Sequence, residues 1–241
     1  MEPGEEIDSI DAAREILRRR GWLRHLPTGL REKLLARSRL LPPLERGQYL
    51  LRFGDKADGI YGIVSGGFSF QIAPHEQGPQ MVHLYRSGAW VGELAYCLGA
   101  TRATSMMATR RSRTVWLPKA DLQALTAAEP ELWRWIALCL AQNTRIALSA
   151  IDDMTIRSPR RRLGATLMRL AGLRPDPEGE QEPAPELDLT QADLALLANM
   201  SRTVVGENLG RLEEQGFLEC GYGVISLIDP AGLCAWLRDT A

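Results

Sequence analysis

The chain has 241 residues and a formal net charge of −1, with 29 Lys and Arg against 30 Asp and Glu. This length predicts two domains, each able to bury its own core, and the balanced charge excludes a global basic field that would attract nucleic acid. The sequence has four widely spaced cysteines, Cys97, Cys139, Cys220 and Cys234, which fit neither a zinc site nor a disulfide framework. Because the N-terminus is acidic and no apolar run reaches membrane-spanning length, we expect a cytoplasmic protein that does not enter a membrane.

The first part of the chain is predicted to begin with helices and to continue as strands. Residues 7–40 show helical periodicity in two stretches, Asp11–Arg20 and Thr28–Arg39, which are broken at Gly21 and Pro27. Short apolar runs separated by glycine-containing turns follow. They predict strands at Tyr49–Phe53, Gly59–Val64, Gly67–Ile72, Met81–Tyr85, Ser105–Ala108 and Thr114–Leu117. Such spacing is typical of an all-β barrel or roll, which the helices would cover.

One long helix is predicted over Pro130–Ile156, because no Gly or Pro interrupts the helical pattern there. Its apolar stripe has coiled-coil spacing and consists of Trp133, Ala137, Leu140, Thr144, Ala147, Ile151 and Met154. This pattern favours a homodimer held by paired helices. A second stripe is nearly as regular and consists of Ile136, Leu140, Asn143, Ala147 and Ala150, so the register stays open. A helix that packs on its own domain is the alternative.

A break is predicted directly after the long helix. Ser158 and Pro159 form a good helix start, with the serine as N-cap and the proline at the first helical position, and the new helix is expected to reach Ala171. The junction is therefore a candidate hinge. The proline-rich, acidic segment from Arg174 to Glu186 is predicted to be a solvated loop.

The last part of the chain has the pattern of a winged helix-turn-helix. Thr190 and Asp193 have the spacing of a capping box and predict a short helix, and Ser201 is the expected cap of a second helix. The turn between them, the end of the second helix and the strands of a hairpin are predicted at Asn199–Met200, Gln215–Gly216, Leu218–Cys220 and Val224–Ile228. A second helix with an exposed N-terminal end is what a major-groove reader requires. An αα-hairpin of a helical bundle is the alternative, but it would lack the trailing hairpin.

The segment GELAYCLGATRATS, residues 92–105, has the residue types of a phosphate and sugar site. A helical turn that begins at Gly92 offers free backbone N–H groups to a phosphate, and Arg102 adds a cation that can form two parallel hydrogen bonds. Glu93 supplies a carboxylate that can accept from a ribose hydroxyl. An internal salt bridge between Glu93 and Arg102 would place the same residues together without any ligand.

The sequence resembles the catabolite-activator/fumarate-nitrate regulator (CRP/FNR) family over nearly the whole chain. The resemblance rests on FGDKADGIYGIVSGG, on the cassette of residues 92–105, on the long helix and on LTQADLALLANMSRTVVGENLGRLEEQGFLE. It implies an α+β fold with an N-terminal double-stranded β-helix (jelly-roll) that binds a cyclic nucleotide, a long dimerisation helix and a C-terminal winged helix-turn-helix. The expected domains are N-terminal sensor helices over 1–40, the β-roll over 41–129, the dimerisation helix over 130–157 and the DNA-binding domain over 158–241.

The resemblance implies cAMP or cGMP as effector ligand and no other cofactor. It places ligand contacts at Gly92, Glu93, Leu94, Arg102 and Ala103, and on the long helix at Asn143 and Thr144. In such families the Gly and Glu bind the ribose and the Arg binds the cyclic phosphate, and a small residue such as Ala103 after the Arg goes with cAMP. One departure is that Ala147 and Leu148 stand where the cAMP-responsive activator has a Thr-Ser pair for the purine. Asn143 and Thr144, one turn earlier, are the candidate replacements.

The resemblance also implies double-stranded DNA as a partner, with a pseudo-palindromic operator whose half-sites lie about one helical turn apart. It places DNA contacts at Thr190, Gln191, Ser201, Arg202, Thr203 and Glu207. The family's second helix typically carries Arg-Glu and, four residues later, another Arg, whereas this chain has Arg202, Thr203 and Glu207 there. Arg202 suits a guanine and Glu207 a cytosine amine, so the operator should differ from the activator's. RNA polymerase is a further partner that the resemblance suggests.

Charge gives the DNA-binding prediction mixed support. From residue 155 onward the chain has nine arginines against thirteen aspartates and glutamates. A group of arginines near the hinge could contact the phosphate backbone, and its members are Arg157, Arg160, Arg161, Arg162 and Arg169. A solvated face, or pairing with the acidic loop, explains the same cluster. We expect modest, strongly salt-dependent DNA binding, controlled allosterically by ligand at the cassette through the long helix and the hinge.

Three other functions compete with this prediction. A regulator of the same fold with another effector, or none, fits most features. Iron–sulfur sensing needs an N-terminal cysteine cluster and no cysteine precedes Cys97, while haem sensing would depend on His25, His75, His83 or Cys97. A cyclic-nucleotide-gated adaptor that binds protein fits the acidic C-terminal part. An enzyme finds no support, since no catalytic triad, metal-ligand spacing or triphosphate-binding loop is present in the sequence.

Overall fold

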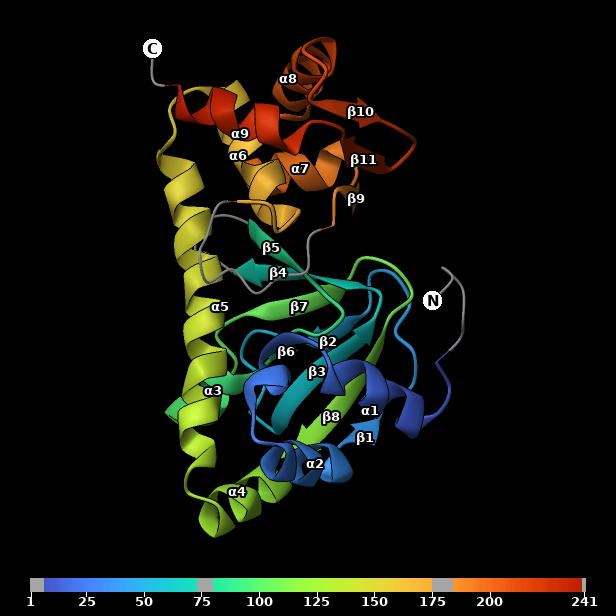
Figure 1. Ribbon diagram of the computed structural model, residues 1–241, viewed down its shortest axis with the longest axis vertical. Helices are drawn as coiled ribbons and strands as arrows, with labels where there is room; N and C mark the ends of the chain where they lie inside the picture. The colour runs from blue at the N-terminus through green and yellow to red at the C-terminus, as the bar shows by residue number, and fades with distance from the viewer. Residues whose placement is uncertain (1–6, 73–79, 175–183, 240–241) are drawn as a thin grey trace. The chain divides into compact units, whose positions relative to one another are not determined.

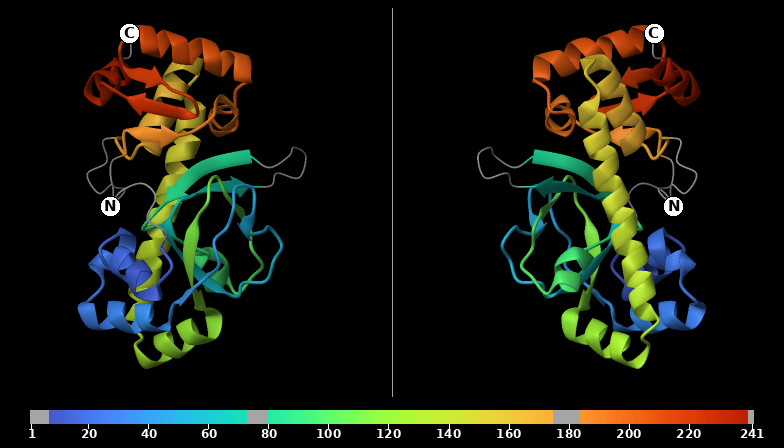
Figure 2. Two further views of the ribbon diagram at one scale, coloured as in Figure 1. Left: turned by 90° about the vertical axis from the view of Figure 1, so that its right-hand side faces the viewer. Right: turned by 90° about the vertical axis from the view of Figure 1, so that its left-hand side faces the viewer.

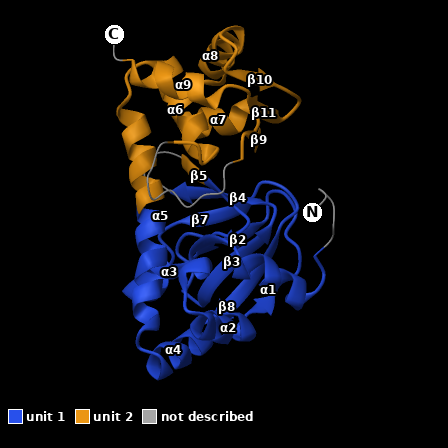
Figure 3. Ribbon diagram, in the orientation of Figure 1, with its two compact units in different colours: residues 1–79, 84–144 blue, residues 80–83, 145–241 orange. Residues whose placement is uncertain are grey.

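The computed structural model describes residues 7–72, 80–174 and 184–239. It divides into two compact units, one formed by residues 1–79 and 84–144 and the other by residues 80–83 and 145–241 (Figure 3). None of the helices within the described ranges is long and apolar enough to cross a membrane.

The β-roll consists of two four-stranded sheets, ordered β1-β8-β3-β6 and β2-β7-β4-β5 (Figure 1). Its strands are β1 (Arg39–Leu40), β2 (Tyr49–Leu51), β3 (Gly59–Ser65), β4 (Gly67–Ile72), β5 (Gln80–Arg86), β6 (Trp90–Val91), β7 (Ser105–Ala108) and β8 (Arg113–Pro118). All the strands predicted in this part of the chain are present. The sequence carries no signal for β1 and β6, because two residues are too few to show alternation. With the C-terminal helices and hairpin described below, these sheets confirm the predicted α+β fold class.

Helices pack against the strands of the roll and share their core. They are α1 (Ile10–Arg18), the 3₁₀ helix η1 (Gly21–His25), α2 (Thr28–Arg37), α3 (Glu93–Leu98), α4 (Lys119–Ala128) and the long α5 (Leu132–Thr155). Figure 2 shows the N-terminal helices gathered beside the strands in both views. The predicted second helix ends earlier than expected, since Arg39 and Leu40 pair with β8 instead. The shared core includes Trp22 and Trp90, whose rings meet edge to face at 6.2 Å.

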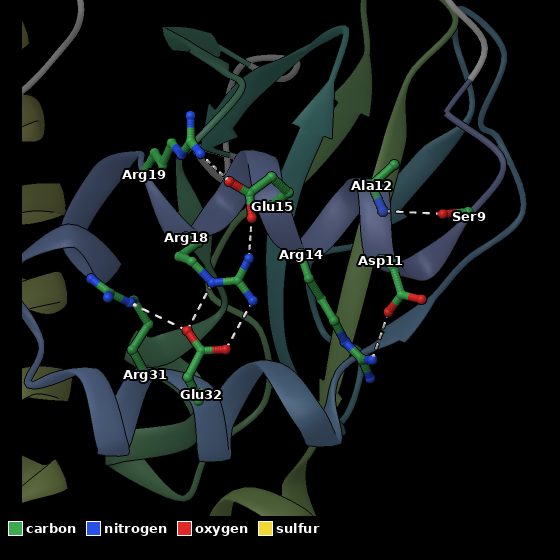
Figure 4. Close-up of polar contacts among 9 residues, drawn as sticks. All are labelled: Ser9, Asp11, Ala12, Arg14, Glu15, Arg18, Arg19, Arg31 and Glu32. Carbon is green, nitrogen blue, oxygen red and sulfur yellow. Dashed lines mark hydrogen bonds and ion pairs between the residues drawn. The ribbon is translucent and has the colours of Figure 1, made fainter.

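Charged side chains join α1 to α2 on the surface of this core (Figure 4). The guanidinium of Arg18 donates from Nε and Nη2 to the two carboxylate oxygens of Glu32, each at 2.8 Å, and it also contacts Glu15. The Arg18 hydrogen bonds lower the pKa of the Glu32 carboxyl. Because both side chains are partly exposed, we expect this pair to contribute little to stability.

The second unit is a winged helix-turn-helix. Its elements are α6 (Pro159–Leu170), β9 (Glu186–Asp188), α7 (Gln191–Ala198), α8 (Arg202–Glu214), β10 (Leu218–Cys220), β11 (Val224–Leu227) and α9 (Pro230–Arg238). The predicted caps are confirmed, since Ser158, Thr190 and Ser201 each accept a hydrogen bond from the backbone of the following helix. Asn199 makes the turn between α7 and α8 with a left-handed φ of 50°.

Two features of this unit differ from the sequence prediction. Glu186 was expected to end a solvated loop, but it begins β9, which pairs with β11 and makes the wing a three-stranded sheet. Residues 175–183 of that loop lie outside the described residues. A last helix, α9, was not predicted, and its start is fixed locally by Asp229, whose side chain accepts from the backbone of Gly232.

A buried charge cluster ties α5 to α6 within the second unit. Arg169 Nε donates to Asp153 Oδ2 at 2.6 Å, and Arg174 Nη1 donates to Asp153 Oδ1 at 2.9 Å. The Arg169 and Asp153 side chains are 4% and 0% exposed. Burial raises the pKa of Asp153 and Arg169 opposes that rise. Arg169 therefore serves the fold, and the suggestion that it meets the DNA backbone is wrong for this structure.

The long helix separates the two apolar stripes that the sequence left open. Of the first stripe, Trp133, Ala137, Thr144 and Ile151 are exposed, whereas Ile136 and Ala150 of the second stripe are buried. Leu148, which belongs to neither stripe, is also exposed. The second stripe therefore packs within the chain, and the first leaves an apolar surface on α5.

Candidate functional site

The cassette begins where β6 ends and α3 starts. Gly92 precedes the six-residue α3 with a left-handed φ of 98°, which favours glycine. A Cβ there would lie 2.6 Å from Nη1 of Arg102. The local backbone thus brings Gly92 against an arginine ten residues later, and no larger residue fits between them.

Arg102 is held by acceptors on three sides. Its Nη1 donates to the Gly92 carbonyl at 2.9 Å, and its Nη2 donates to the Gly59 carbonyl at 2.8 Å and to Asp58 Oδ1 at 2.7 Å. The side chain is 3% exposed. Among the described residues, the buried Nε has no hydrogen-bond partner. The guanidinium is therefore fixed in place with one buried donor unused.

The carboxylate that pairs with Arg102 is Asp58, a residue for which the sequence predicted no role. Asp58 Oδ2 also accepts from the hydroxyl of Tyr61 at 2.6 Å, and the Arg102 guanidinium lies 5.7 Å from the centre of the Tyr61 ring. Burial and the hydrogen bond to Asp58 raise the pKa of Tyr61. Asp58 lies within the FGDKADGIYG stretch, but nothing in one sequence links it to an arginine 44 residues away.

Glu93 is hydrogen-bonded to Asn143 and not to Arg102, the partner that the salt-bridge alternative predicted. Its Oε1 accepts from Nδ2 of Asn143 on α5 at 2.8 Å, and the same amide donates to the Trp90 carbonyl at 3.0 Å. Glu93 is buried, and burial raises the pKa of its carboxyl while the Asn143 hydrogen bond opposes that rise. The predicted alternative of a Glu93–Arg102 salt bridge is wrong. The cassette is instead joined to α5 through an amide.

The remaining predicted ligand residues lie at the periphery of this arrangement. Leu94 and Ala103 are exposed neighbours of Glu93 and Arg102. Thr144 is exposed, and its hydroxyl donates to the Leu140 carbonyl of its own helix at 2.8 Å. Asn143, which was expected to meet a base, binds Glu93 in this structure.

The helix-turn-helix presents a polar face beside its core. Val205, Leu209 and Leu212 of α8 are buried, which leaves the opposite side of the helix exposed. Most predicted DNA contacts lie on exposed positions, namely Gln191, Ser201, Arg202, Thr203 and Glu207, while Thr190 is half-buried. Arg202 forms no ion pair or hydrogen bond with the described part of the chain. Its guanidinium is thus available to a partner.

The arginines at the start of α6 are partly used by the fold. Arg160 and Arg161 lie over the ring of Trp236 in α9, with guanidinium-to-centroid distances of 5.3 and 5.0 Å. Arg161 also donates to the Leu237 carbonyl at 3.2 Å. Arg157 is exposed. Of the predicted cluster, this residue keeps the freest side chain for phosphate.

Metal-binding groups are not gathered anywhere in the described ranges, where no set of three His, Cys, Asp or Glu residues has a suitable arrangement. His83 is buried with its Nδ1 3.3 Å from Nη1 of Arg169, and Cys97 is exposed. His75 lies outside the described residues.

Comparison with known families decides what these two units are. Residues 42–129 match the model of the cyclic nucleotide-binding domain, and residues 161–236 match that of the Crp-like helix-turn-helix domain. The chain belongs to the CRP/FNR family. This CRP/FNR protein is a DNA-binding transcription regulator with a cyclic-nucleotide-binding domain.

Individual relatives agree with this assignment. The regulator is 27% identical over 176 residues to the transcriptional regulator SdrP of Thermus thermophilus, covering 73% of this chain and 82% of SdrP. It is 24% identical over 175 residues to the cAMP-activated global transcriptional regulator CRP of Escherichia coli O6:H1, covering 70% and 80%. A solved CRP/FNR-family transcriptional regulator from Thermus thermophilus superposes with a TM-score of 0.64 at 25% identity, covering 84% of this chain and 100% of that chain.

A further match is shorter. A candidate potassium channel protein of Rhodopseudomonas palustris is 32% identical over 93 residues, which make up 39% of this chain and 22% of that protein. The regulator therefore spans less than a quarter of that relative, and the likeness concerns one portion of it.

Proposed function

We propose that this regulator is a homodimer whose DNA binding is controlled allosterically by a cyclic nucleotide, with cAMP favoured over cGMP. The observation that carries the proposal is the joined arrangement of Arg102, Glu93 and Asn143. The first two supply a cation and a carboxylate at one cassette, and Asn143 connects that cassette directly to α5. A ligand that contacts Glu93 thereby alters the environment of the helix that pairs in the dimer.

The residues present fit a cyclic phosphate and a sugar hydroxyl. The buried Nε of Arg102, which has no partner in the described part of the chain, matches a phosphate oxygen, and the Glu93 carboxylate matches a hydroxyl donor. Ala103 favours cAMP by the family resemblance, and the cAMP-activated CRP of Escherichia coli is among the relatives. Gly92 and Leu94 complete the proposed ligand contacts, and Asn143 and Thr144 remain the proposed substitutes on the helix side.

The exposed stripe of α5 supports the dimer. Trp133 and Ile151 are large apolar side chains that stay 46% and 61% exposed in the single chain, although one face of the Trp133 ring stacks on Tyr96. Pairing two such helices would bury them. In the dimer the two copies of α8 would read half-sites about one helical turn apart, with Arg202 on a guanine and Glu207 on a cytosine. Action in the cytoplasm and contact with RNA polymerase stay predictions.

A second candidate is a CRP/FNR regulator with another effector or none. The observation that favours it is that Arg102 already has a carboxylate partner and Glu93 an amide partner inside the chain. The adaptor alternative predicts in addition that no duplex is bound. Selection from random duplexes by gel shift separates that alternative from a regulator.

The deciding experiment is calorimetric titration of the purified protein with cAMP and with cGMP, repeated with Arg102→Ala. Arg46→Ala is the matched control, because Arg46 is an exposed arginine of the same roll. We expect micromolar binding of cAMP that is weakened roughly 100-fold in Arg102→Ala, since hydrogen bonds to charged groups contribute about 1.5–3 kcal/mol each. If the natural protein binds neither nucleotide, control by a cyclic nucleotide is overturned and the second candidate is favoured.

A further inference from the structure

The Arg102–Asp58 pair has an asymmetry that matters for any anionic ligand. The arginine is 3% exposed, whereas its carboxylate partner is 52% exposed. The cation is therefore held in the protein, while the anion stands at the surface and can exchange its bonds for water. Few internal salt bridges in the described residues combine an immobile cation with so exposed a partner.

The bonds around Arg102 show which of its partners can be replaced. The carbonyls of Gly92 and Gly59 belong to the backbone, so rotation of a side chain cannot withdraw them from Arg102. Asp58 is a side chain, and it is held by Nη2 of Arg102 and by the Tyr61 hydroxyl. A second anion at this guanidinium would be repelled by the carboxylate, because like charges within a few ångströms disfavour each other. Either Asp58 leaves or the incoming phosphate binds less tightly.

We propose that Asp58 is an internal competitor of the ligand phosphate for Arg102 and so sets the affinity of the cassette. The inference rests on the proposed function, since it takes the cyclic phosphate as the incoming anion. Asp58 occupies the guanidinium in place of a ligand and keeps the buried charge compensated. A phosphate oxygen that binds the partnerless Nε brings a second anion to the same guanidinium and so favours departure of the carboxylate from Nη2.

The test is titration with cAMP of the natural protein, of Asp58→Asn and of Asp55→Asn. Asparagine keeps the shape and an acceptor oxygen but removes the charge. Asp55 is a matched control because it is an acid of the same loop whose side chain forms no hydrogen bond or ion pair with the Arg102 guanidinium in the described structure. Only its backbone carbonyl accepts from the Arg102 amide, at 2.8 Å. We expect Asp58→Asn to lower the dissociation constant for cAMP about tenfold, since a charged hydrogen bond at Arg102 becomes a neutral one. Asp55→Asn should change it less than about threefold.

Each result decides the inference. If the natural protein binds cAMP and Asp58→Asn binds it no more tightly, the competition is overturned while the proposed function stands. If only Asp58→Asn binds, the competition is supported and the proposed function of the natural chain fails. If none of the three proteins binds cAMP, both the competition and the proposed function fail.

A second variant keeps the test valid if Asp58→Asn does not fold, as judged by thermal unfolding. Tyr61→Phe removes the hydroxyl that donates to Asp58 and leaves the charge on the carboxylate. Asp58 is then held less firmly at Arg102, and cAMP binding should tighten in the same direction by less than about tenfold. Weaker binding in Tyr61→Phe would contradict the inference.

Discussion

The two units each contain a buried arginine paired with an aspartate, and the pairs differ in the exposure of the aspartate. Arg102 and Arg169 are 3% and 4% exposed, but Asp58 is 52% exposed whereas Asp153 is 0% exposed. Water or a ligand anion can replace an exposed carboxylate at its arginine. A buried carboxylate that left its arginine would lack both a partner and water, which is energetically costly. The comparison predicts that burial of the counter-ion, rather than of the arginine, separates an exchangeable site from a structural one.

The largest expected effect breaks the structural pair. Asp153→Ala leaves Arg169 buried without its carboxylate and removes a partner of Arg174, so we expect the free energy of unfolding to fall by about 3–5 kcal/mol. Urea denaturation followed by circular dichroism measures this loss. Asp152→Ala is the matched control, because that neighbouring acid is exposed and should matter by less than about 1 kcal/mol.

The same measurement on Asp58→Ala sharpens the contrast. Asp58 is exposed, and the carbonyls of Gly59 and Gly92 still accept from Arg102 when it is removed. We therefore expect a loss of roughly 1 kcal/mol, well below that of Asp153→Ala. Equal losses in the two variants would show that exposure of the counter-ion does not distinguish the pairs.

Arg202 extends the comparison to an arginine that has no partner in the described residues. Because its side chain is exposed, Arg202→Ala should change the free energy of unfolding by less than about 0.5 kcal/mol. Its binding to a selected operator should weaken by about 1–3 kcal/mol, with discrimination lost at one base pair. Fluorescence anisotropy with matched and mismatched duplexes measures both. Arg238→Ala, an exposed arginine of α9, is the control, and an equal effect there would argue against base contact.

What the sequence could predict depended on how far apart the interacting residues lie. The caps at Ser158, Thr190 and Ser201 are set by residues within one turn, and they were predicted correctly. Gly92 and Arg102 stand in one short segment and are brought together as expected.

The missed features involve distant or very short segments. Asp58 lies 44 residues from Arg102, and Asn143 lies 50 residues from Glu93, so neither pairing has a local signal. Strands β1, β6 and β9 have two or three residues each and exist because a longer strand is available to pair with them. Burial of Asp153 and Arg169 likewise follows from the packing of α5 on α6, which spacing alone does not reveal.

Glu93 offers a pH-dependent test of the cassette. Burial raises its folded-state pKa above the usual value of 4.5, so at pH values between the unfolded and folded pKa the folded protein holds more of the proton than the unfolded chain does. Stability from this group is present below the unfolded pKa and is lost as the pH rises through the folded one. Glutamine does not titrate, so Glu93→Gln lacks this loss of stability with rising pH. The free energy of unfolding of the variant, relative to that of the natural protein, should therefore be greater at about pH 7 than at about pH 4.

Thermal and urea unfolding across this pH range measure the trend, and Glu131→Gln, at an exposed position before α5, is the control. A relative stability of Glu93→Gln that stays constant from about pH 4 to about pH 7 would contradict the assigned cost of burial. Glutamine can still accept from Asn143, so the variant separates charge from hydrogen bonding at this position.

A small effect on the free energy of unfolding is expected at the surface pair of α1 and α2, where both partners reach solvent. Arg18 lowers the pKa of Glu32, so the stability from this pair is present above the unfolded pKa and is lost as the pH falls. Glu32→Gln should lower the free energy of unfolding by at most about 0.5–1 kcal/mol at about pH 7, and its effect should shrink as the pH falls and the natural carboxyl takes up a proton. A double-mutant cycle with Arg18→Ala measures the coupling energy between the two side chains. A coupling energy as large as the loss in Asp153→Ala would mean that exposure of the counter-ion has little influence on how much an ion pair stabilises the fold.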